Sequence, residues 1–577
     1  MEVLGINARS WMFATLAVGA STVAACGTKA GSGFDDTSKP PPPGGGTSVM
    51  DASVAADGET PFGQDIPLGD GSIDDPRGPR DPETCDEAAQ ARSYMGCSFW
   101  PTVVPNPVKK LFDYAVVVSN GGKESATITV TGPSNTNRTV TVKPGELEKI
   151  FLPWIDALKE PTGADQLKAS IVARASAYHL VSDRPVVVYQ FNALEYKGQG
   201  GPSGKDWSTC LTFAEKLQGV GCYSYTNDAS LLLPTTAMTG NYRVFGQHGW
   251  TSDPVLNPLT FEYETHTEAG YFAVTATENG TTVTVKAAGN IVASGTGSAV
   301  AVAAAAAGST FDLTLDAGDV AVLSGELGQD KDVSGSLLKA DKPIQVIAGV
   351  PCINQPADVM ACDHVEETVF PAETLGKHYV VTVPTGPSKP IVGHIVRFYG
   401  NADDTKLSYV PSRPAGCPDA LAAGQVVECG PLATDFEVTA SHEFAVGTFM
   451  LGGELLDPGK TQLPLGDPSM SFPVSVEQFR RSYIFLAPDD YMMSFVDVVA
   501  PPGTKVLIDG VENKDAPTAI STNFEIRRVK LGAGNRGSHT LTADKPTGIQ
   551  VIGYGENTSY QYPAGLNLGQ IAPAPIR

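Results

Sequence analysis

The stretch that decides the fold runs from Ala340 to Pro371 and reads ADKPIQVIAGVPCINQPADVMACDHVEETVFP. It opens with a turn, Asp341-Lys342-Pro343, that leads into an apolar run ending at Val350. Related turn-and-strand segments begin at three other turns, which are Ser182-Asp183-Arg184-Pro185, the degenerate Ala440-Ser441-His442-Glu443, and Ala543-Asp544-Lys545-Pro546. Repetition of one segment at such intervals predicts a tandem array of one structural unit.

Between these turns, short β-branched and aromatic runs alternate with turn residues. Tyr271 to Thr277 and Thr281 to Val285, for example, flank Asn279-Gly280, which is the strongest short signal for a β-hairpin. Each unit holds about six or seven such runs, with turn signals every 8–12 residues or so, as in antiparallel sandwiches. We therefore predict an all-β fold of about four tandem, immunoglobulin-like β-sandwich modules. A β-propeller-like array, with about four strands per repeat, is the alternative.

A second motif recurs between the units, in which a proline precedes an aromatic strand. Pro234 precedes Tyr242, and the same relation holds for Pro371 with Tyr379 and for Pro473 with Tyr483. Together the two motifs divide the chain. The expected domains are a signal peptide over 1–26, a tether over 27–82, and β modules over 83–227, 228–363, 364–468 and 469–577.

The first 26 residues have the features of a secretory signal. A single cation, Arg9, precedes an apolar segment from Trp11 to Ala25, which is too short to span a bilayer stably. The segment ends in Val23-Ala24-Ala25-Cys26, which resembles the bacterial lipobox, so we expect Cys26 to be lipidated. The alternative is an ordinary signal peptide with a free cysteine. Gly27 rather than an aspartate follows, so the expected destination is the outer membrane.

The residues over 27–82 are rich in Gly, Ser, Pro and Asp and cannot bury a core, so they predict a flexible tether. The whole chain has 577 residues, 42% of them apolar and 18% charged, which suits packed domains. Its formal net charge of -23 excludes nucleic acid as a partner. The same charge permits calcium sites without requiring them.

Apart from Cys26, the eight remaining cysteines form four closely spaced pairs of neighbours. Eight cysteines allow about 105 pairings, but the regular spacing favours disulfides between neighbours, each closing a short loop or hairpin. Zinc is the alternative, although no C-x-x-C spacing occurs. Disulfides imply an oxidising compartment. The expected pairs are Cys85 with Cys97, Cys210 with Cys222, Cys352 with Cys362, and Cys417 with Cys429.

The densest group of potential ligands follows Cys362 and comprises Asp363, His364, Glu366 and Glu367. We interpret it first as a disulfide corner whose polar side chains bond nearby backbone. The alternative is a metal site, with calcium favoured over zinc because carboxylates predominate, and Asp363, Glu366 and Glu367 as ligands. No other cofactor is expected. The pattern from Gly532 to Gly537 matches G-x-G-x-x-G, but a strand rather than a helix follows, so it predicts a turn.

Several motifs, in order along the chain, resemble the N-terminal domain of the IgGFc-binding protein family. The resemblance extends over most of the chain from about residue 93 to 555 and is closest to bacterial lipoprotein members. It implies an extracellular, β-rich, disulfide-bonded interaction module. The family name implies binding to antibody Fc, but no residue-level motif for that ligand can be transferred. The motifs are Tyr94 to Trp100, Ser182 to Asn192, Asn227 to Pro234, and Cys362 to Glu367.

These features predict a lipid-anchored protein of the cell envelope, at the surface or on the periplasmic face of the outer membrane. It would recognise a protein or glycan partner without catalysis. One alternative is a carbohydrate-active enzyme that uses carboxylates near Asp363 and Glu366. The other is a purely structural envelope lipoprotein with no diffusible ligand.

Overall fold

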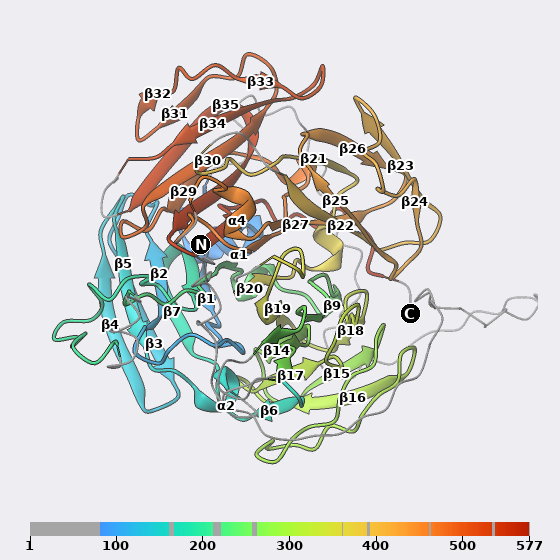
Figure 1. The fold of residues 1–577 in the computed structure, drawn as a ribbon. Coiled ribbons are helices and arrows are strands. Elements are labelled where there is room, and N and C mark those ends of the chain that lie inside the picture. The colour runs from blue at the N-terminus through green and yellow to red at the C-terminus, as the bar shows by residue number, and fades with distance from the viewer. Residues whose placement is uncertain are drawn as a thin grey trace, which may run out of the picture.

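The computed structural model describes residues 81–160, 167–211, 221–256, 262–359, 362–388, 393–460, 463–532 and 537–575. Their regular structure is almost entirely antiparallel β-sheet (Figure 1), as predicted. The expected signal peptide with Cys26, and all of the tether except its last two residues, lie outside these ranges. No helix in the described part is long and apolar enough to cross a membrane.

The strands form four modules. The first holds β1 (Gly96–Phe99), β2 (Tyr114–Ser119), β3 (Ala126–Gly132), β4 (Thr136–Val142), β5 (Leu147–Leu152), β7 (His179–Phe191) and β8 (Ala229–Leu232). The second holds β9 (Asn241–Arg243), β14 (Tyr271–Ala276), β15 (Thr281–Lys286), β16 (Thr310–Leu315), β17 (Val320–Ser324), β18 (Leu337–Ala340), β19 (Ile344–Ile353) and β20 (Asp363–Thr368). Two short hairpins project from it, β10 (Trp250–Thr251) with β13 (Thr267–Glu268), and β11 (Val255–Leu256) with β12 (Tyr263–Glu264).

The third module holds β21 (His378–Val381), β22 (His394–Gly400), β23 (Thr405–Val410), β24 (Ala420–Leu421), β25 (Val426–Leu432), β26 (Phe436–Ala440), β27 (Phe444–Met450) and β28 (Met470–Ser471). The fourth holds β29 (Arg480–Leu486), β30 (Met493–Ala500), β31 (Val506–Ile508), β32 (Val511–Glu512), β33 (Thr518–Ala519), β34 (Glu525–Lys530), β35 (Ser538–Gly555) and β36 (Thr558–Pro563). The helices are α1 (Cys85–Ala91), α2 (Asp156–Lys159), α4 (Gly453–Leu456), η1 (Thr235–Ala237), η2 (Ala372–Thr374) and η3 (Val476–Gln478).

Each module is a sandwich of two antiparallel sheets with the same strand order. The axial sheets, which reach the centre of the molecule, are β5-β2-β7-β8, β17-β14-β19-β20, β25-β22-β27-β28 and β34-β30-β35-β36. The outer sheets are β4-β3-β7-β1, β16-β15-β18-β9, β24-β23-β26-β21 and β32-β31-β35-β29. The prediction of four tandem sandwich modules is therefore confirmed.

The four modules surround a central axis (Figure 1). Their last strands lie against one another there, β8 next to β20 and β36, and β28 next to the same two strands. This is the arrangement of a four-bladed propeller. The alternative prediction, a β-propeller-like array, therefore describes how the four sandwiches are arranged around the axis. The largest apolar core contains side chains from all four modules, among them Val187, Phe272, Phe449 and Ile552. The modules are consequently packed together rather than strung out.

The predicted module boundaries differ from the structure by one strand. Residues 228–232 were assigned to the second module, yet β8 pairs with β7 of the first, where Val188 lies opposite Leu232. The same shift moves β20 into the second module and β28 into the third. These strands carry polar residues that are buried at the axis. In a local sequence pattern, polar residues indicate a connection between modules, so the sequence does not reveal that these strands belong to the preceding sheets.

The repeated turn is held by its first polar side chain. Asp341 Oδ1 accepts a hydrogen bond from the N–H of Thr282, at the start of the neighbouring outer strand, over 2.8 Å. In the degenerate copy the Ser441 hydroxyl oxygen accepts the N–H of Lys406 over 2.9 Å. Asp183 and Asp544 do the same in the other modules. In each module the turn thus provides a side-chain oxygen that caps a backbone N–H of an outer strand. Aspartate and serine can both supply this oxygen.

The second motif contacts the first. The hydroxyl of Tyr242 donates to the carbonyl of Ile344, directly after the turn proline, over 2.7 Å. Tyr379 donates to Phe444 over 2.7 Å, and Tyr483 donates to Thr547. The two recurrent sequence motifs therefore form one recurrent contact between the first outer strand of a module and its turn.

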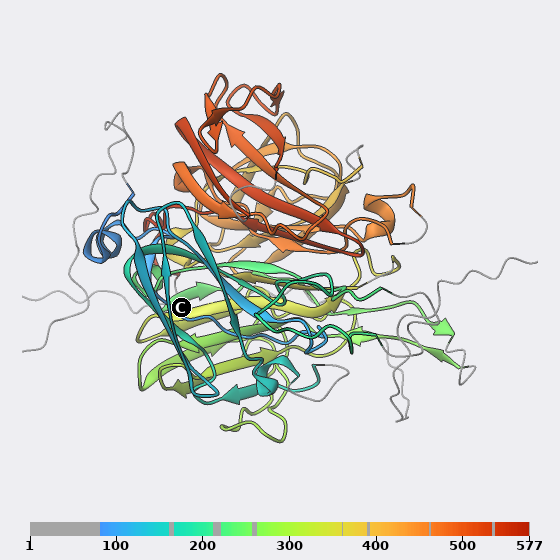
Figure 2. The same cartoon turned by 90° about the vertical axis from the view of Figure 1, so that its left-hand side faces the viewer.

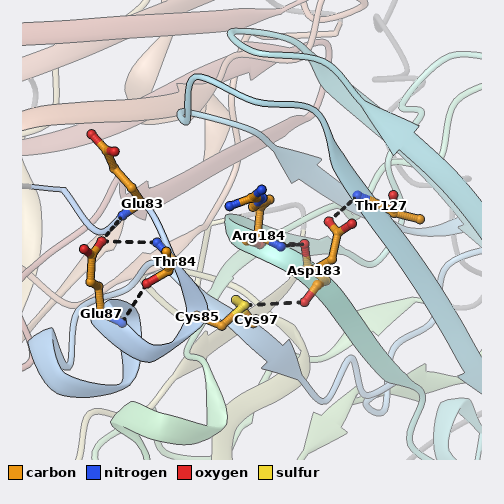
Figure 3. Close-up of a disulfide and its surroundings, with 9 residues drawn as sticks. Glu83, Thr84, Cys85, Glu87, Cys97, Thr127, Asp183 and Arg184 are labelled. Carbon is orange, nitrogen blue, oxygen red and sulfur yellow. Dashed lines mark hydrogen bonds between the residues drawn. A yellow bond between two sulfur atoms is a disulfide. The ribbon is translucent and has the colours of Figure 1, made fainter.

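Four disulfides join the predicted neighbours, and each lies within one module. The pairs are Cys85–Cys97, Cys210–Cys222, Cys352–Cys362 and Cys417–Cys429. The first fixes helix α1 to β1 (Figure 3). Thr84 caps this helix, because its hydroxyl accepts the N–H of Glu87 while the Glu87 carboxylate accepts the N–H of Thr84.

The two ends of the described chain close the ring. Asp81, inside the predicted tether, forms an ion pair with Arg480 of the fourth module. Tyr94 N–H donates to the carbonyl of Leu566, and Leu568 N–H donates to that of Arg92 over 2.9 Å. Figure 2 shows α1, in blue, at the left-hand rim beside the blue and cyan strands of the first module. Asp81 therefore lies at the seam between the first and last modules.

Candidate functional site

The sequence-predicted ligands lie at the centre of the ring. Strand β20 carries Asp363, His364, Glu366 and Glu367, and all four side chains are completely buried. Their burial follows from the position of β20, which is the last strand of its axial sheet and is enclosed by β8 and β28. The group is thus an interior polar cluster, not a surface pocket.

Glu366 connects the first two modules. Its carboxylate accepts hydrogen bonds from Gln190 Nε2 and from the Ser230 hydroxyl, each over 3.1 Å. In return, Asp228 on the first module accepts the backbone N–H of Glu366 over 3.1 Å, and that of Met470 on the third module over 3.4 Å. These contacts satisfy backbone donors on strands that meet at the axis without pairing as a sheet.

Related contacts join the third and fourth modules at the same axis. The Gln561 side-chain amide donates to the carbonyls of Thr448 and Ser469, over 3.0 and 2.8 Å. The hydroxyl of Ser559 donates to the carbonyl of Asp467. All four modules are therefore linked through buried polar groups along one line.

Burial sets the charge state of these acids. It raises the pKa of Asp228, Asp363, Glu367 and Asp467 well above the ordinary carboxyl value, since no solvent stabilises the ionised form. The charge of Asp467 raises the pKa of Asp363 further. Such carboxyls favour the neutral form, which is a weak ligand for a cation.

The calcium prediction for Asp363, Glu366 and Glu367 gains no support from this geometry. Within the ranges that the structure describes, no three His, Cys, Asp or Glu side chains form a group that could hold a metal ion. Calcium takes six to eight or so oxygen ligands, usually including water. A site without solvent access does not fit that requirement.

Sequence reasoning missed Asp228, Asp467, Gln190 and Ser230 as members of this cluster. A signal for part of it exists. Four buried polar residues each stand four positions before a proline that lies at or just after the end of an axial strand: Ser230, Glu367, Ser469 and Ser559. The constant spacing of these polar residues from the repeated prolines is the signal that could have marked them as equivalent positions of the four modules.

A solvent-accessible cleft of about 560 Å³ lies between the third and fourth modules. Met493, Phe495 and Ile526 provide its apolar lining. Arg528 and Lys530 stand at its side, and the Arg528 guanidinium is already paired with Asp435 over 2.8 Å. Its volume is that of a small-ligand site, and such sites are common between domains.

The family described as IgGFc binding protein matches residues 228–553. The chain belongs to this family. The match includes modules two, three and most of four, and with them Asp228, Asp363, Glu366, Glu367 and Asp467. In this IgGFc-binding family protein the family resemblance expected from the sequence is therefore confirmed over residues 228–553.

The other comparisons add no identification. No curated protein matches the chain. An anti-sigma factor domain-containing protein from Clostridium clariflavum is 13% identical, with 56% of this chain and 98% of that chain covered and a TM-score of 0.11. A tetra-tandem repeat in the extending region of a large adhesion protein is 10% identical, with coverages of 80% and 97% and a TM-score of 0.08. Scores this low carry no argument about fold or function.

Proposed function

We propose that this protein is a lipid-anchored binding protein of the cell envelope, which holds a protein or glycan partner without catalysis. Membership of the IgGFc-binding family is the observation that carries the proposal. The four disulfides support a location in an oxidising compartment. The lipobox-like end of the signal segment supports attachment through Cys26.

The shape of the chain suits presentation of a partner at a distance from a membrane. The segment 27–82 supplies reach, and it joins the ring at Asp81, where Arg480 and Ser482 bond the aspartate. A pull on the tether would thus act on a seam that several hydrogen bonds reinforce, next to helix α1, which a disulfide fixes to β1 within the first module. The outer membrane is the proposed site of anchoring.

The carboxylates suggested for the alternative, a carbohydrate-active enzyme, are not accessible to a substrate. Asp363 and Glu366 are 0% exposed, so a polysaccharide cannot reach either carboxylate. A glycoside hydrolase needs both carboxylates in contact with substrate. Recognition would instead use exposed features such as the cleft between modules three and four.

Radiolabelled palmitate and membrane fractionation test the anchor. The native chain is expected to incorporate the label and to sediment with outer membranes, whereas Cys26→Ser is expected to do neither. Binding is tested with the full-length chain against IgG Fc, Fab and purified envelope polysaccharide. Saturable binding to one probe without release of reducing ends is expected, and release of reducing ends that Glu366→Gln abolishes would contradict the proposal.

A further inference from the structure

The four axial sheets differ in whether another strand pairs with their outer edge. In the second module a short strand from the first, β6 (Ile171–Ala173), pairs with the edge strand β17, so that Val172 lies opposite Ala321. In the fourth module β33 pairs with the edge strand β34. Two of the four edges are thus already extended by an added strand.

The edge of the third module is interrupted. Its edge strand β25 contains Gly430-Pro431, and its pairing with β22 shifts register between His394 and Val396. Proline has no N–H to donate, and a bulge twists an edge away from a new partner. Cys429 is also tied to Cys417. This edge is poorly suited to accept another strand.

The edge of the first module is regular and open. Strand β5 reads Leu147-Glu-Lys-Ile-Phe-Leu152, with no proline or glycine, and it pairs with β2 over its whole length without a register shift. Among the described residues, β2 is its only strand partner. An edge of this kind presents unpaired backbone donors and acceptors to solvent.

The direction of these groups follows from the ladder. Asn120 N–H donates to the carbonyl of Glu146 over 3.0 Å at the end of the β2–β5 pair. Because hydrogen-bonded pairs alternate along an antiparallel ladder, Glu148, Ile150 and Leu152 direct their backbone groups to β2. Leu147, Lys149 and Phe151 therefore direct theirs away from β2. Leu147 is only 2% exposed, so the accessible part of the edge is formed by Lys149 and Phe151.

We propose that β5 binds an extended segment of a partner protein as an additional strand. The inference rests on the proposed function, since it says how the partner is held. Backbone hydrogen bonds would supply affinity and alternate side chains specificity. Phe151 is partly exposed beside the edge, so an apolar side chain is expected next to it.

Charge favours a different protein over a second copy as the occupant. Lys149 is 25% exposed and already paired with Asp489 of the fourth module over 2.7 Å, so the edge itself is close to neutral. The whole chain carries a net charge of -23, which repels another copy of itself. The expected partner segment is apolar in alternation and belongs to a neutral or basic protein.

The test compares Lys149→Pro with Lys149→Ala in the full-length chain. Both remove the ion pair with Asp489, but only proline removes an N–H that points to the edge, and proline is tolerated at such a position. Phe151→Pro with Phe151→Ala forms a second matched pair. Equal melting temperatures and intact disulfides within each pair would show that the fold is kept.

The probe is a display library of random short peptides selected on the native chain. Selected peptides are expected to bind Lys149→Ala as they bind the native protein, and to bind Lys149→Pro about tenfold more weakly or worse, a loss of about 1.4 kcal/mol.

Equal affinity for both variants would overturn the edge site and leave the proposed function intact. A dimer of the native chain that Lys149→Pro abolishes would assign the edge to a second copy and overturn the partner. If neither peptides, Fc nor polysaccharide bind the native chain, the proposed function itself fails.

Discussion

At the scale of single residues, the same contact recurs with different side chains. Asp183, Asp341 and Asp544 accept an outer-strand N–H, and Ser441 replaces them in the third module. The repeat therefore conserves a hydrogen bond rather than an amino acid, which is why the third copy is hard to recognise in the sequence. The residue-scale predictions concern this cap and one buried carboxylate.

Replacing Asp341 with alanine is expected to lower the free energy of unfolding by about 1 kcal/mol, because the N–H of Thr282 loses its acceptor. Asp341→Ser is expected to retain most of the stability, since Ser441 makes the equivalent bond in its own module. Urea denaturation of the two variants measures the difference. Equal losses for alanine and serine would show that the hydroxyl cannot act as the cap at this position.

Asp490 is expected to make stability depend on pH. Burial raises its pKa to about 6, and it accepts the N–H of Tyr196 across the seam between the fourth and first modules. Because the folded pKa exceeds the unfolded one, stability from this group is full below about pH 4 and is lost as pH rises to about 6, by roughly 3 kcal/mol. The change in melting temperature between about pH 4 and pH 7 should be smaller in Asp490→Asn than in the native chain. An unchanged slope would exclude Asp490 as the cause.

At the scale of elements, short hairpins closed by disulfides support the modules. Cys352–Cys362 joins the ends of β19 and β20, with a sequence separation of 10. The double change Cys352→Ser, Cys362→Ser is expected to lower stability by about 3 kcal/mol in the chain-entropy view. Guanidinium denaturation of oxidised protein measures the loss. A variant as stable as the native chain would mean that packing of β20 at the axis alone fixes this hairpin.

Much of the element order could be predicted because its determinants are local. Asn279-Gly280 forms the turn between β14 and β15 as expected, with Gly280 at a φ of 64° that suits glycine. The ends of the modules could not be predicted in the same way. Asp228, directly before β8, and Glu366, on β20, are buried where partners from other modules form hydrogen bonds with them. A contact between residues 138 positions apart leaves no local pattern.

At the scale of the whole molecule, the ring is closed by its two ends. Arg480, whose side chain is 4% exposed, bonds both Asp81 and the Asn567 side chain and lies over the ring of Tyr94. Closure fixes the first module to the last and places Asp81 at the seam between them. It also explains why one core extends through all four modules.

Arg480→Ala is expected to lower the free energy of unfolding by about 2 kcal/mol, since it removes a buried guanidinium that bonds the half-exposed Asp81 and the side chain of Asn567. Limited proteolysis should then cut near Asp81 and α1 much faster than in the native protein. Arg413→Ala is the matched control, because Arg413 and Asp419 form an exposed pair that contributes little. Equal resistance of the two variants to protease would show that closure does not depend on Arg480.

The central claim, a binding ring held outside the cell by a lipid tether, is tested most directly by protease treatment of intact cells. Cleavage within 27–82 is expected to release a fragment that contains all four disulfide-bonded modules. Cells in which Cys26→Ser replaces the native chain should release no such fragment, because the chain would not be anchored at their surface. Protection of the native chain until the outer membrane is opened would contradict surface exposure and place the modules in the periplasm.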